Sequence, residues 1–512
     1  MKLIINSNYT RYGKNVYLLG TASFGPTNCP IQITSISHLY SIFGSKGSLI
    51  NAYKQIYNLV SDLNIFCCKI TGSHAVTFLN VNIENDDVFE NGLEIKSIYS
   101  SDIYNNVKID LYNDNITFTF PDELSISSIR YNFEDFYTLG ALIDQINKDT
   151  ENGLNCVECQ LYCDTDIEIY GALSTVNPGT LYLFGGNNGL NASKNTLYCC
   201  LQDTLELLRG QYIDFIVPLD MYIDDIEIED DGEYSIDEYS KCCYTNLKDK
   251  LKKMSGKKVS YYDLLLSFCI QQLHEGMLTM GIMGYNPTSD MYLNNSKDLY
   301  VDTAIKYLNQ NKINPLYSSY YQLISVVVGD IIVEHLSKNV NGYIVYAIEC
   351  ANIGLMDCPT NKVIADNIFL YNEFDNKDLA KFADNGLVAL RFSPYYENVV
   401  FSSCVTSCDK DNLMHNMQNL KAIQFSVSCI YDIFQEYVGE DLDMLLTENM
   451  LTNIIKNCLT LIKEQGLIDK FKFTLIRETE HNIKIYLYLK TKQMADYFKA
   501  IHKISIREWF FE

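Results

Sequence analysis

Three cysteines in the first third of the chain have the spacing closest to that of a metal site. Cys156, Cys159 and Cys163 form a Cys-x2-Cys-x3-Cys pattern, and closely spaced thiolates bind zinc or iron–sulfur clusters. However, these residues fall on a predicted strand in which Cys159, Leu161 and Cys163 share one face, and neither a second Cys-x2-Cys pair nor clustered histidines complete four ligands. The pattern therefore favours a buried strand over a zinc or iron–sulfur site.

An acidic segment could bind calcium. Residues 223–238 contain nine acidic and no basic side chains. The ligand and glycine positions of an EF-hand loop are matched in part by Glu227, Glu229, Asp231, Gly232 and Glu238. Glutamate replaces aspartate at the first two ligand positions, and the preceding residues predict a strand where an EF-hand has a helix. A solvated acidic loop is the better interpretation.

Glycines after a predicted strand could form a phosphate loop. The run from Gly185 to Gly189 follows the apolar segment TLYLF, where an α/β fold places bound phosphates. It lacks both the Gly-Lys-Ser/Thr ending of a P-loop and GxGxxG spacing. We therefore expect a turn and no nucleotide cofactor.

No pattern of catalytic residues stands out. The seven histidines occur singly, at positions 38, 74, 274, 335, 415, 481 and 502, and the chain has no HExxH or GxSxG motif. The sequence therefore predicts no catalytic residue, no metal ligand and no cofactor. An alternative is a cytosolic α/β hydrolase or metal-dependent enzyme with a β-rich insertion, and that alternative requires a convergent polar pocket.

Composition indicates a folded, multidomain, intracellular protein. The chain has 512 residues, which is too long for one ordinary core. Its hydrophobic content of 47% is sufficient for a folded protein. We expect no membrane span, because no apolar run approaches ~18–20 residues, and no signal peptide. Seventeen cysteines, several of them adjacent, fit a reducing compartment in which cysteine acts as a small buried hydrophobe.

The charge is unevenly distributed. The net charge of −24 argues against nucleic acid as a partner, because phosphate contacts need clustered Lys and Arg. Residues 449–512 nevertheless carry eleven basic and seven acidic side chains, a net of +4. This contrast indicates that one surface meets an acidic partner, although ordinary scatter of solvated charges is the alternative.

Periodicity predicts an α/β (mixed α+β) chain. A helix is expected over 48–60 and a strand over 65–70, followed by short alternating strands with one helix over 136–147. Buried strands are then expected at TLYLFGG, YIDFIVPLD and NGYIVYAIE, with a long helix running into a strand over 261–284. The last region predicts two helices, the strand pair FKFTLIRE and IKIYLYLK, an amphipathic helix and a final strand.

The segment from Asn15 to Gly47 resembles the contractile phage tail sheath family, whose members also occur in phage-like contractile injection particles. A strand runs into Gly20-Thr21-Ala22, a Gly25-Pro26 turn and an I-x-I strand follow, and a polar segment leads to a Phe-Gly pair. Later segments are similar to the family in the same order: TLYLFGGNNG, YIDFIVPLD, FADNGLVALRFSP and KAIQFSVSCIYDIFQEYVGE.

The resemblance implies a structural protein and not an enzyme. Family subunits assemble as hexameric rings stacked helically around a tail tube, and contraction drives the tube through a cell envelope. The expected partners are other copies of the chain, the tail tube protein, and baseplate and tail terminator proteins, with no nucleic acid and no direct membrane insertion. The expected location is the virion, after assembly in the host cytoplasm.

Family subunits are joined by terminal arms that add strands to a neighbour's sheet, which is β-augmentation. Short apolar segments near each end match this role, and the expected inter-subunit strand contacts are Leu3, Ile4, Ile5, Ile504, Ile506 and Arg507. The amphipathic helix carries basic side chains opposite its apolar stripe, and the expected tube-facing residues are Lys492, Lys499 and Lys503.

The expected organisation has six parts along the chain. They are an N-terminal arm (1–14), the first part of the sheath core (15–73), a β-rich inserted domain (74–170), a subtilisin-like α/β middle domain (171–370), a C-terminal assembly domain of α+β type (371–503) and a C-terminal arm (504–512).

Overall fold

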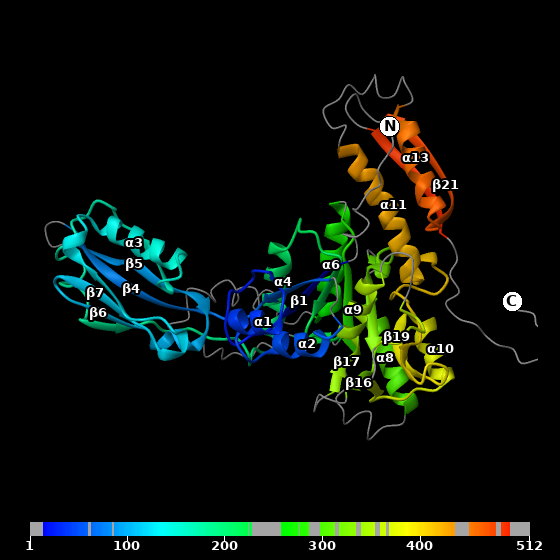
Figure 1. Cartoon of the computed structure of the whole chain (residues 1–512), viewed down its shortest axis with the longest axis horizontal. Coiled ribbons are helices and arrows are strands. Elements are labelled where there is room, and N and C mark those ends of the chain that lie inside the picture. The colour runs from blue at the N-terminus through cyan, green and yellow to red at the C-terminus, as the bar shows by residue number, and fades with distance from the viewer. Residues whose placement is uncertain are drawn as a thin grey trace, which may run out of the picture.

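The structure is a computed structural model of the whole chain. The residues it describes are 14–59, 63–83, 87–223, 225–227, 258–275, 277–285, 297–312, 317–333, 339–353, 359–364, 368–435, 450–477 and 483–491. They are arranged as a large central sheet with its helices, a β-rich unit at one end and a helix–hairpin unit at the other (Figure 1).

The central sheet has eight strands, six of which run parallel. The two outer strands, at either edge, are antiparallel to their neighbours. Most of these strands are continuous apolar runs, as expected when helices cover both faces of a parallel sheet. In spatial order they are β2 (Ile31–Ile33), β3 (Asn64–Lys69), β1 (Asn15–Gly20), β11 (Phe215–Pro218), β14 (Met280–Tyr285), β15 (Ile324–Val328), β19 (Leu387–Ser393) and β20 (Asn398–Phe401).

Helices pack on both faces of this sheet. Two glycines of β14 lie against different helices. A Cβ added at Gly281 would lie 2.6 Å from Leu265 Cδ2 of α6, and a Cβ added at Gly284 would lie 2.5 Å from Tyr343 Cδ1 of α9. Residues three apart on a strand point to opposite faces, so α6 and α9 lie on opposite sides. The helices of this unit are α1 (Ile36–Phe43), α2 (Ser48–Ile56), α4 (Lys194–Leu207), α6 (Tyr261–His274), α8 (Lys297–Asn311), α9 (Gly342–Asn352) and α10 (Asn376–Asp384).

The segment NGYIVYAIE was predicted to be a strand, and that prediction is wrong. It forms most of helix α9, in which every side chain from Tyr343 to Ile348 is buried. A helix that is buried on all sides has no polar face, so its sequence lacks the 3.6-residue period that distinguishes a helix from a buried strand. The helix contacts β1, β11, β14 and β15, which explains its uniformly apolar composition.

The β-rich unit consists of two small sheets and one helix around a core of its own. Strands β4 (His74–Ile83), β5 (Asp87–Ser100) and β9 (Val157–Leu161) form one sheet, and α3 (Leu139–Glu151) packs on it. The second sheet has the order β10 (Thr180–Tyr182), β6 (Lys108–Leu111), β7 (Asn115–Thr119) and β8 (Ile129–Asn132). Short 3-10 turns lie at Asp102–Asn106, Asp122–Leu124 and Phe133–Asp135.

Strand β10 differs from the prediction for TLYLFGG. The segment was expected to be a buried strand, but it lies at the edge of the second small sheet, paired with β6, and both Thr180 and Tyr182 are exposed. Only one neighbour covers an edge strand, so an apolar run at this position can remain partly in water.

A neck joins the β-rich unit to the large sheet. We define it as residues 69–74, 100–102 and 184–189. Ser73 and Asn187 exchange two backbone hydrogen bonds of 2.9 and 3.1 Å. The buried Lys69 Nζ donates to Ser100 O at 2.5 Å, and burial lowers the pKa of this lysine to about 7, against a smaller opposing effect of Asp102. The neck is thus held by hydrogen bonds across three segments that are distant in sequence.

Two further small sheets lie beside the large one. One pairs β12 (Asp225–Glu227) with β13 (Lys258–Ser260), and the other has the order β17 (Asn339–Asn341), β16 (Asp330–Val333) and β18 (Ile368–Leu370). Short 3-10 turns precede β15 at Tyr321–Leu323 and α11 at Leu413–His415. The mixed α/β, multidomain architecture expected from the sequence is confirmed.

The chain ends, within the described part, in a helix–hairpin unit. It consists of α11 (Met417–Gln435), α13 (Met450–Glu464) and the strands β21 (Ile468–Arg477) and β22 (Ile483–Thr491). Helix α11 links two cores, because Met417 and Leu420 belong to that of the large sheet, whereas Phe425 and Ile430 belong to a third, smaller core. Figure 1 shows α11 running from the large sheet toward the hairpin.

Candidate assembly site

The hairpin is supported by the two helices beneath it. Helix α13 buries Leu451, Ile455, Cys458, Leu459 and Ile462, a spacing of three and four residues that makes one apolar stripe. This stripe faces α11 and one side of the hairpin. The unit therefore has its own small core, from which the hairpin extends as the outer layer.

The strands β21 and β22 alternate between an inner and an outer face. The antiparallel register places Phe473 opposite Leu487 and Leu475 opposite Ile485. These side chains, with Phe471 and Leu489, pack partly buried against the third core. Because strand side chains alternate between faces, the residues between them must point away from the helices.

The outer face of the hairpin combines lysines with exposed apolar side chains. Ile476 is 47% exposed, Tyr486 42% and Tyr488 62%. The exposed residues of this outer face are Lys470, Lys472, Thr474, Ile476, Tyr486, Tyr488 and Lys490. Within the described part of the chain, this arrangement leaves apolar surface in contact with water.

The outer face is also basic. Three of its seven exposed residues are lysines, namely Lys470, Lys472 and Lys490, in a chain of net charge −24. Lys470 lies directly opposite Lys490 in the register, and like charges at such positions repel. Lys490 Nζ lies 3.8 Å from Asp469 Oδ2, and this single exposed ion pair offsets little of the repulsion. An acidic partner surface would relieve it.

Both edges of the hairpin are open within the described part of the chain. β21 and β22 form a two-stranded sheet, and neither strand pairs with a further described strand. Two-stranded sheets are marginal by themselves, and an open edge presents backbone N–H and C=O groups that another chain can bind. The hairpin, with its open edges and basic outer face, is therefore the candidate assembly site.

The carboxyl edge of the large sheet is where an α/β enzyme would bind its ligand. There the buried Tyr343 ring packs over Gly284, and its hydroxyl accepts a hydrogen bond from Asp220 N at 3.1 Å. Burial raises the pKa of Asp330 to about 6 and also raises that of Asp220. A protein side chain thus fills this stretch of the edge, which gives no support to the α/β hydrolase alternative.

Comparison with solved structures identifies the fold. Neither a protein-family model nor a curated protein sequence matches the chain. Among solved structures, a sheath tail protein from Listeria innocua is 11% identical, with a TM-score of 0.53 over 96% of both chains. The chain has the tail sheath fold.

Two other structures with a sheath or contractile context are similar to a lower degree. A sheath tail protein from Desulfitobacterium hafniense is 10% identical and covers 95% of both chains, with a TM-score of 0.48. A chain of the anti-feeding prophage baseplate in its contracted state is 9% identical, with a TM-score of 0.47, and the match covers 99% of this chain and 97% of that one.

Within this sheath fold, the cysteine motif has the environment of a packed strand. Cys156 and Cys159 are buried in the core of the β-rich unit, and burial raises the pKa of both thiols, that of Cys156 to about 12. Metal ligation requires the thiolate. Among the described residues, no group of three or more His, Cys, Asp or Glu side chains could hold a metal ion.

The described residues include part of the candidate calcium loop and the whole of the candidate phosphate loop. Glu227 ends strand β12, and the remaining candidate calcium ligands, Glu229, Asp231 and Glu238, lie outside the described residues. The glycine run from Gly185 to Gly189 forms part of the neck, where Asn105 Nδ2 donates to Gly186 O at 2.9 Å and Thr71 Oγ1 donates to Gly189 O at 3.2 Å. Its backbone is therefore occupied by protein partners.

The described histidines have structural partners. His74 Nδ1 lies 2.6 Å from Ser97 O, and burial lowers its pKa. His415 places both ring nitrogens against carbonyl oxygens, those of Cys408 at 2.8 Å and Ala383 at 2.9 Å. The ring of His274 packs edge-on against Tyr320. These contacts hold loops and helices in place.

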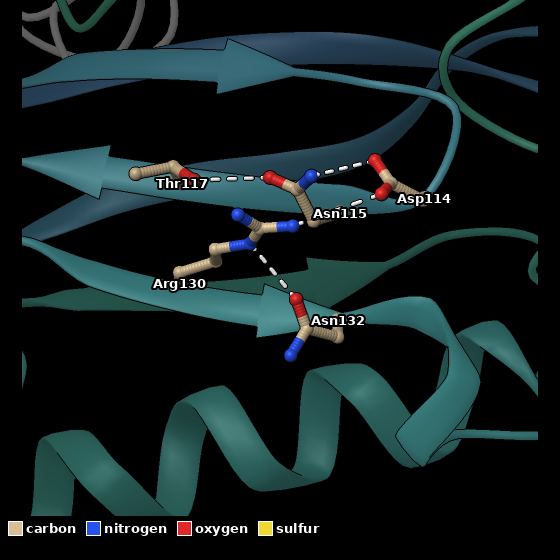
Figure 2. Close-up of polar contacts among 5 residues, drawn as sticks. All are labelled: Asp114, Asn115, Thr117, Arg130 and Asn132. Carbon is tan, nitrogen blue, oxygen red and sulfur yellow. Dashed lines mark hydrogen bonds and ion pairs between the residues drawn. The ribbon is translucent and has the colours of Figure 1, made fainter.

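A network of polar contacts joins strands β7 and β8 in the β-rich unit. Figure 2 shows Asp114, Asn115 and Thr117 around β7 with Arg130 and Asn132 of β8. Arg130 Nε donates to Asn132 Oδ1 at 2.8 Å, and its guanidinium lies 3.7 Å from Asp114. Because Arg130 and Asp114 are both more than half exposed, this pair contributes little stability.

The sequence did not identify the outer face of the hairpin as a site. The signal was available in part, because Lys470, Lys472 and Lys490 occupy alternate positions that one face of a strand pair must share. The residues named in advance, namely Leu3, Ile4, Ile5, Lys492, Lys499, Lys503, Ile504, Ile506 and Arg507, all lie outside the described residues. No described helix is long and apolar enough to cross a bilayer.

Proposed function

We propose that this chain is the structural subunit of a contractile tail sheath. It polymerises as stacked hexameric rings around a tail tube, and contraction of the polymer drives the tube through a cell envelope. The observation that carries the proposal is the open-edged hairpin β21–β22 on a chain with the tail sheath fold. No catalytic step belongs to this function.

In the proposed assembly, strands from neighbouring copies add to the edges of the hairpin. The segments suited to this are residues 2–6 and 504–508, which contain the apolar groups Leu3-Ile4-Ile5 and Ile504-Ser505-Ile506. Each added strand would satisfy the free backbone groups of one edge. The division into arms, sheath core, inserted domain, middle domain and C-terminal domain at the boundaries given above is part of this proposal.

The basic outer face of the hairpin is proposed to face the acidic surface of an inner tube. Lys470, Lys472 and Lys490 supply the charge within the described part of the chain, and Lys492, Lys499 and Lys503 follow directly in the sequence. Electrostatic complementarity of this kind sets register and rate of encounter more than affinity. Baseplate and tail terminator proteins are the proposed partners at the ends of the polymer, and the assembled particle is the proposed location.

Electron microscopy of truncated chains tests the proposal. The full-length protein is expected to form rings or tubes, whereas chains that lack residues 1–8 or 503–512 are expected to remain folded monomers. Circular dichroism and size-exclusion chromatography provide the control for folding. Full-length protein that stays monomeric at high concentration would count against a sheath subunit. Normal tubes from both truncated chains would refute the proposed role of the arms alone.

A further inference from the structure

Lys69 lies in the neck without contact with solvent. Its side chain is fully buried, and Nζ donates a hydrogen bond of 2.5 Å to Ser100 O, on the other side of the neck. Among the described residues, this carbonyl oxygen is the one hydrogen-bond acceptor of the amine, and no carboxylate lies within ion-pair distance of it. A buried ammonium group needs an anion or several acceptors for its three N–H donors. The closed neck therefore suits the uncharged amine better than the ammonium.

The contacts around Lys69 join the two units. Lys69 is the last residue of β3, in the large sheet, whereas Ser100 is the last residue of β5, in the β-rich unit. Ser100 Oγ lies 2.5 Å from Thr27 Oγ1, and Ser101 Oγ donates to Ser23 O at 3.1 Å. A separation of the two units at the neck would break these contacts together and expose the Lys69 amine to water.

The neck has backbone features of a hinge. Gly72 and Gly185 have positive φ angles of 125° and 78°, which glycine adopts without strain, and hinges absorb motion at a few residues between rigid elements. A Cβ added at Gly72 would lie 2.7 Å from Ser100 Oγ, so the closed neck also requires glycine there. Each of the two units has a hydrophobic core of its own. Opening at the neck therefore leaves both cores packed.

We propose that the neck is a hinge that opens when Lys69 takes up a proton. In the closed neck the uncharged amine donates to Ser100 O, and in the open neck the ammonium group is hydrated. The β-rich unit is then free to turn relative to the large sheet. The hinge belongs to the single chain, so it is independent of the assembly proposed above.

The groups next to the amine leave it without a counter-ion in contact. Burial lowers the pKa of Lys69 to about 7, and Asp102, in the 3-10 turn after β5, opposes this effect only in part. The Asp102 carboxylate has other partners in the neck, because its Oδ1 accepts hydrogen bonds of 3.2 Å from both Ser101 Oγ and Asn188 Nδ2. Burial raises the pKa of the neighbouring Cys68 thiol, which therefore stays neutral.

The remaining elements of the neck add no negative charge. Burial lowers the pKa of His74, at the start of β4, and the charges of Lys96 and Lys69 lower it further. The segments 23–28 and 184–189, which also line the neck, contain no charged side chain. Acidification thus adds positive charge to the neck at Lys69 and, at lower pH, at His74.

Linkage between proton uptake and opening sets the direction and size of the effect. A hydrated lysine has a pKa of about 10.4, against about 7 in the closed neck. The open neck therefore gains population as pH falls from about 10.4 toward 7, and the gain levels off below about 7. Between pH 8.5 and pH 7, the ratio of open to closed neck should rise about fifteenfold.

Native-state hydrogen exchange of the full-length chain tests the hinge. Protection factors are compared between pH 8.5 and pH 7, because they are corrected for the intrinsic effect of pH on exchange. The reporters are neck amides that donate hydrogen bonds to backbone carbonyls, namely Asn28, Ser73 and Asn187. Their protection should fall about fifteenfold over this range. Amides of the central strands β14 and β15 should be better protected at each pH, because they open only when a core unfolds.

Two variants separate Lys69 from other lysines. Lys69→Met replaces the amine with an unbranched apolar side chain, and its neck protection should change less than about twofold over the same range. Lys463→Met, at an exposed position, should follow the wild-type chain. Neck protection that is independent of pH in the wild-type chain, or an equal dependence in Lys69→Met, would overturn the proposal. So would neck amides that exchange only as slowly as those of β14 and β15. If Lys69→Met does not fold, the wild-type pH series decides by itself.

Discussion

The ring of Phe24 stacks on the ring of Tyr104, with 5.8 Å between their centroids. Phe24 lies in the turn after β1, in the large-sheet unit, whereas Tyr104 is fully buried in the core of the β-rich unit. Phe24 also meets Tyr99 edge-on at 5.2 Å. One side chain of the Asn15–Gly47 segment therefore inserts into the neighbouring unit, beside the hydrogen bonds of the neck.

Phe24→Ala is predicted to loosen the neck. The substitution removes a half-buried ring from the contact between the two units, and we expect a loss of about 2 kcal/mol in local stability, less than for a fully buried phenylalanine. Native-state hydrogen exchange should show faster exchange at the amides of Ser73 and Asn187, which pair across the neck.

Phe369→Ala is the matched control, because Phe369 is 55% exposed on the edge strand β18. This variant should exchange at the wild-type rate at both neck amides. Equal exchange rates in wild-type and Phe24→Ala proteins would show that Phe24 does not stabilise the neck.

The buried Lys69 is predicted to make the free energy of unfolding depend on pH in the range from about 7 to about 10.4. Its pKa is about 7 in the folded chain because of burial, against about 10.4 in an unfolded chain. A depressed folded-state pKa contributes stability that is present above the unfolded pKa and is lost as pH falls toward the folded one. From pH 10.4 to 7, wild-type stability should therefore fall relative to Lys69→Met by up to about 1.4 kcal/mol per pH unit.

Chemical denaturation at several pH values between 7 and 10.5 measures this difference. Lys463→Met, at an exposed position near the end of α13, should follow the wild-type pH dependence. If Lys69→Met retained the wild-type slope, Lys69 would not be the group that titrates.

Gly284→Ala is predicted to destabilise the packing of α9 on the sheet. The added Cβ would lie 2.5 Å from Tyr343 Cδ1, so the buried ring would have to shift, and overpacking of this kind costs about 1–3 kcal/mol. The control is Gly179→Ala, where the closest atom to the added Cβ is Leu111 O at 3.8 Å. Thermal unfolding should show a lower melting temperature only for Gly284→Ala.

Charge reversal on the hairpin is predicted to impair assembly on a tube and to leave the fold intact. The double variant Lys472→Glu, Lys490→Glu replaces two exposed lysines of the outer face, and polymerisation with tube protein should slow by at least about tenfold at low salt, with a smaller effect at high salt. Lys463→Glu, on the supporting helix, is the control. Light scattering follows the assembly, and an identical rate for all three proteins would refute the role of the face.

Much of the large sheet could be predicted because its elements are long or strongly patterned. The strand leading into Gly20 and the helix α6 running toward β14 were predicted, as was a helix over 48–60, which forms over Ser48–Ile56. Helix α9 was not, because a helix surrounded by protein loses the polar face that makes its period visible. The error follows from burial on all sides.

The candidate site was predictable only in part. The strand pair at the C-terminus was expected from alternation and is confirmed. Which lysines share a face with Tyr486 and Tyr488 depends on the register, and the core shared by α11, α13 and the hairpin depends on how these elements pack. Register and helix packing are tertiary properties, which a local pattern does not determine.

A cryo-electron microscopy reconstruction of polymers of the full-length chain tests the central claim most directly. The account predicts a tubular assembly in which the sheet β21–β22 has additional strands, contributed by the terminal segments of neighbouring copies. A tube in which this sheet remains two-stranded, with both edges exposed to solvent, would contradict it.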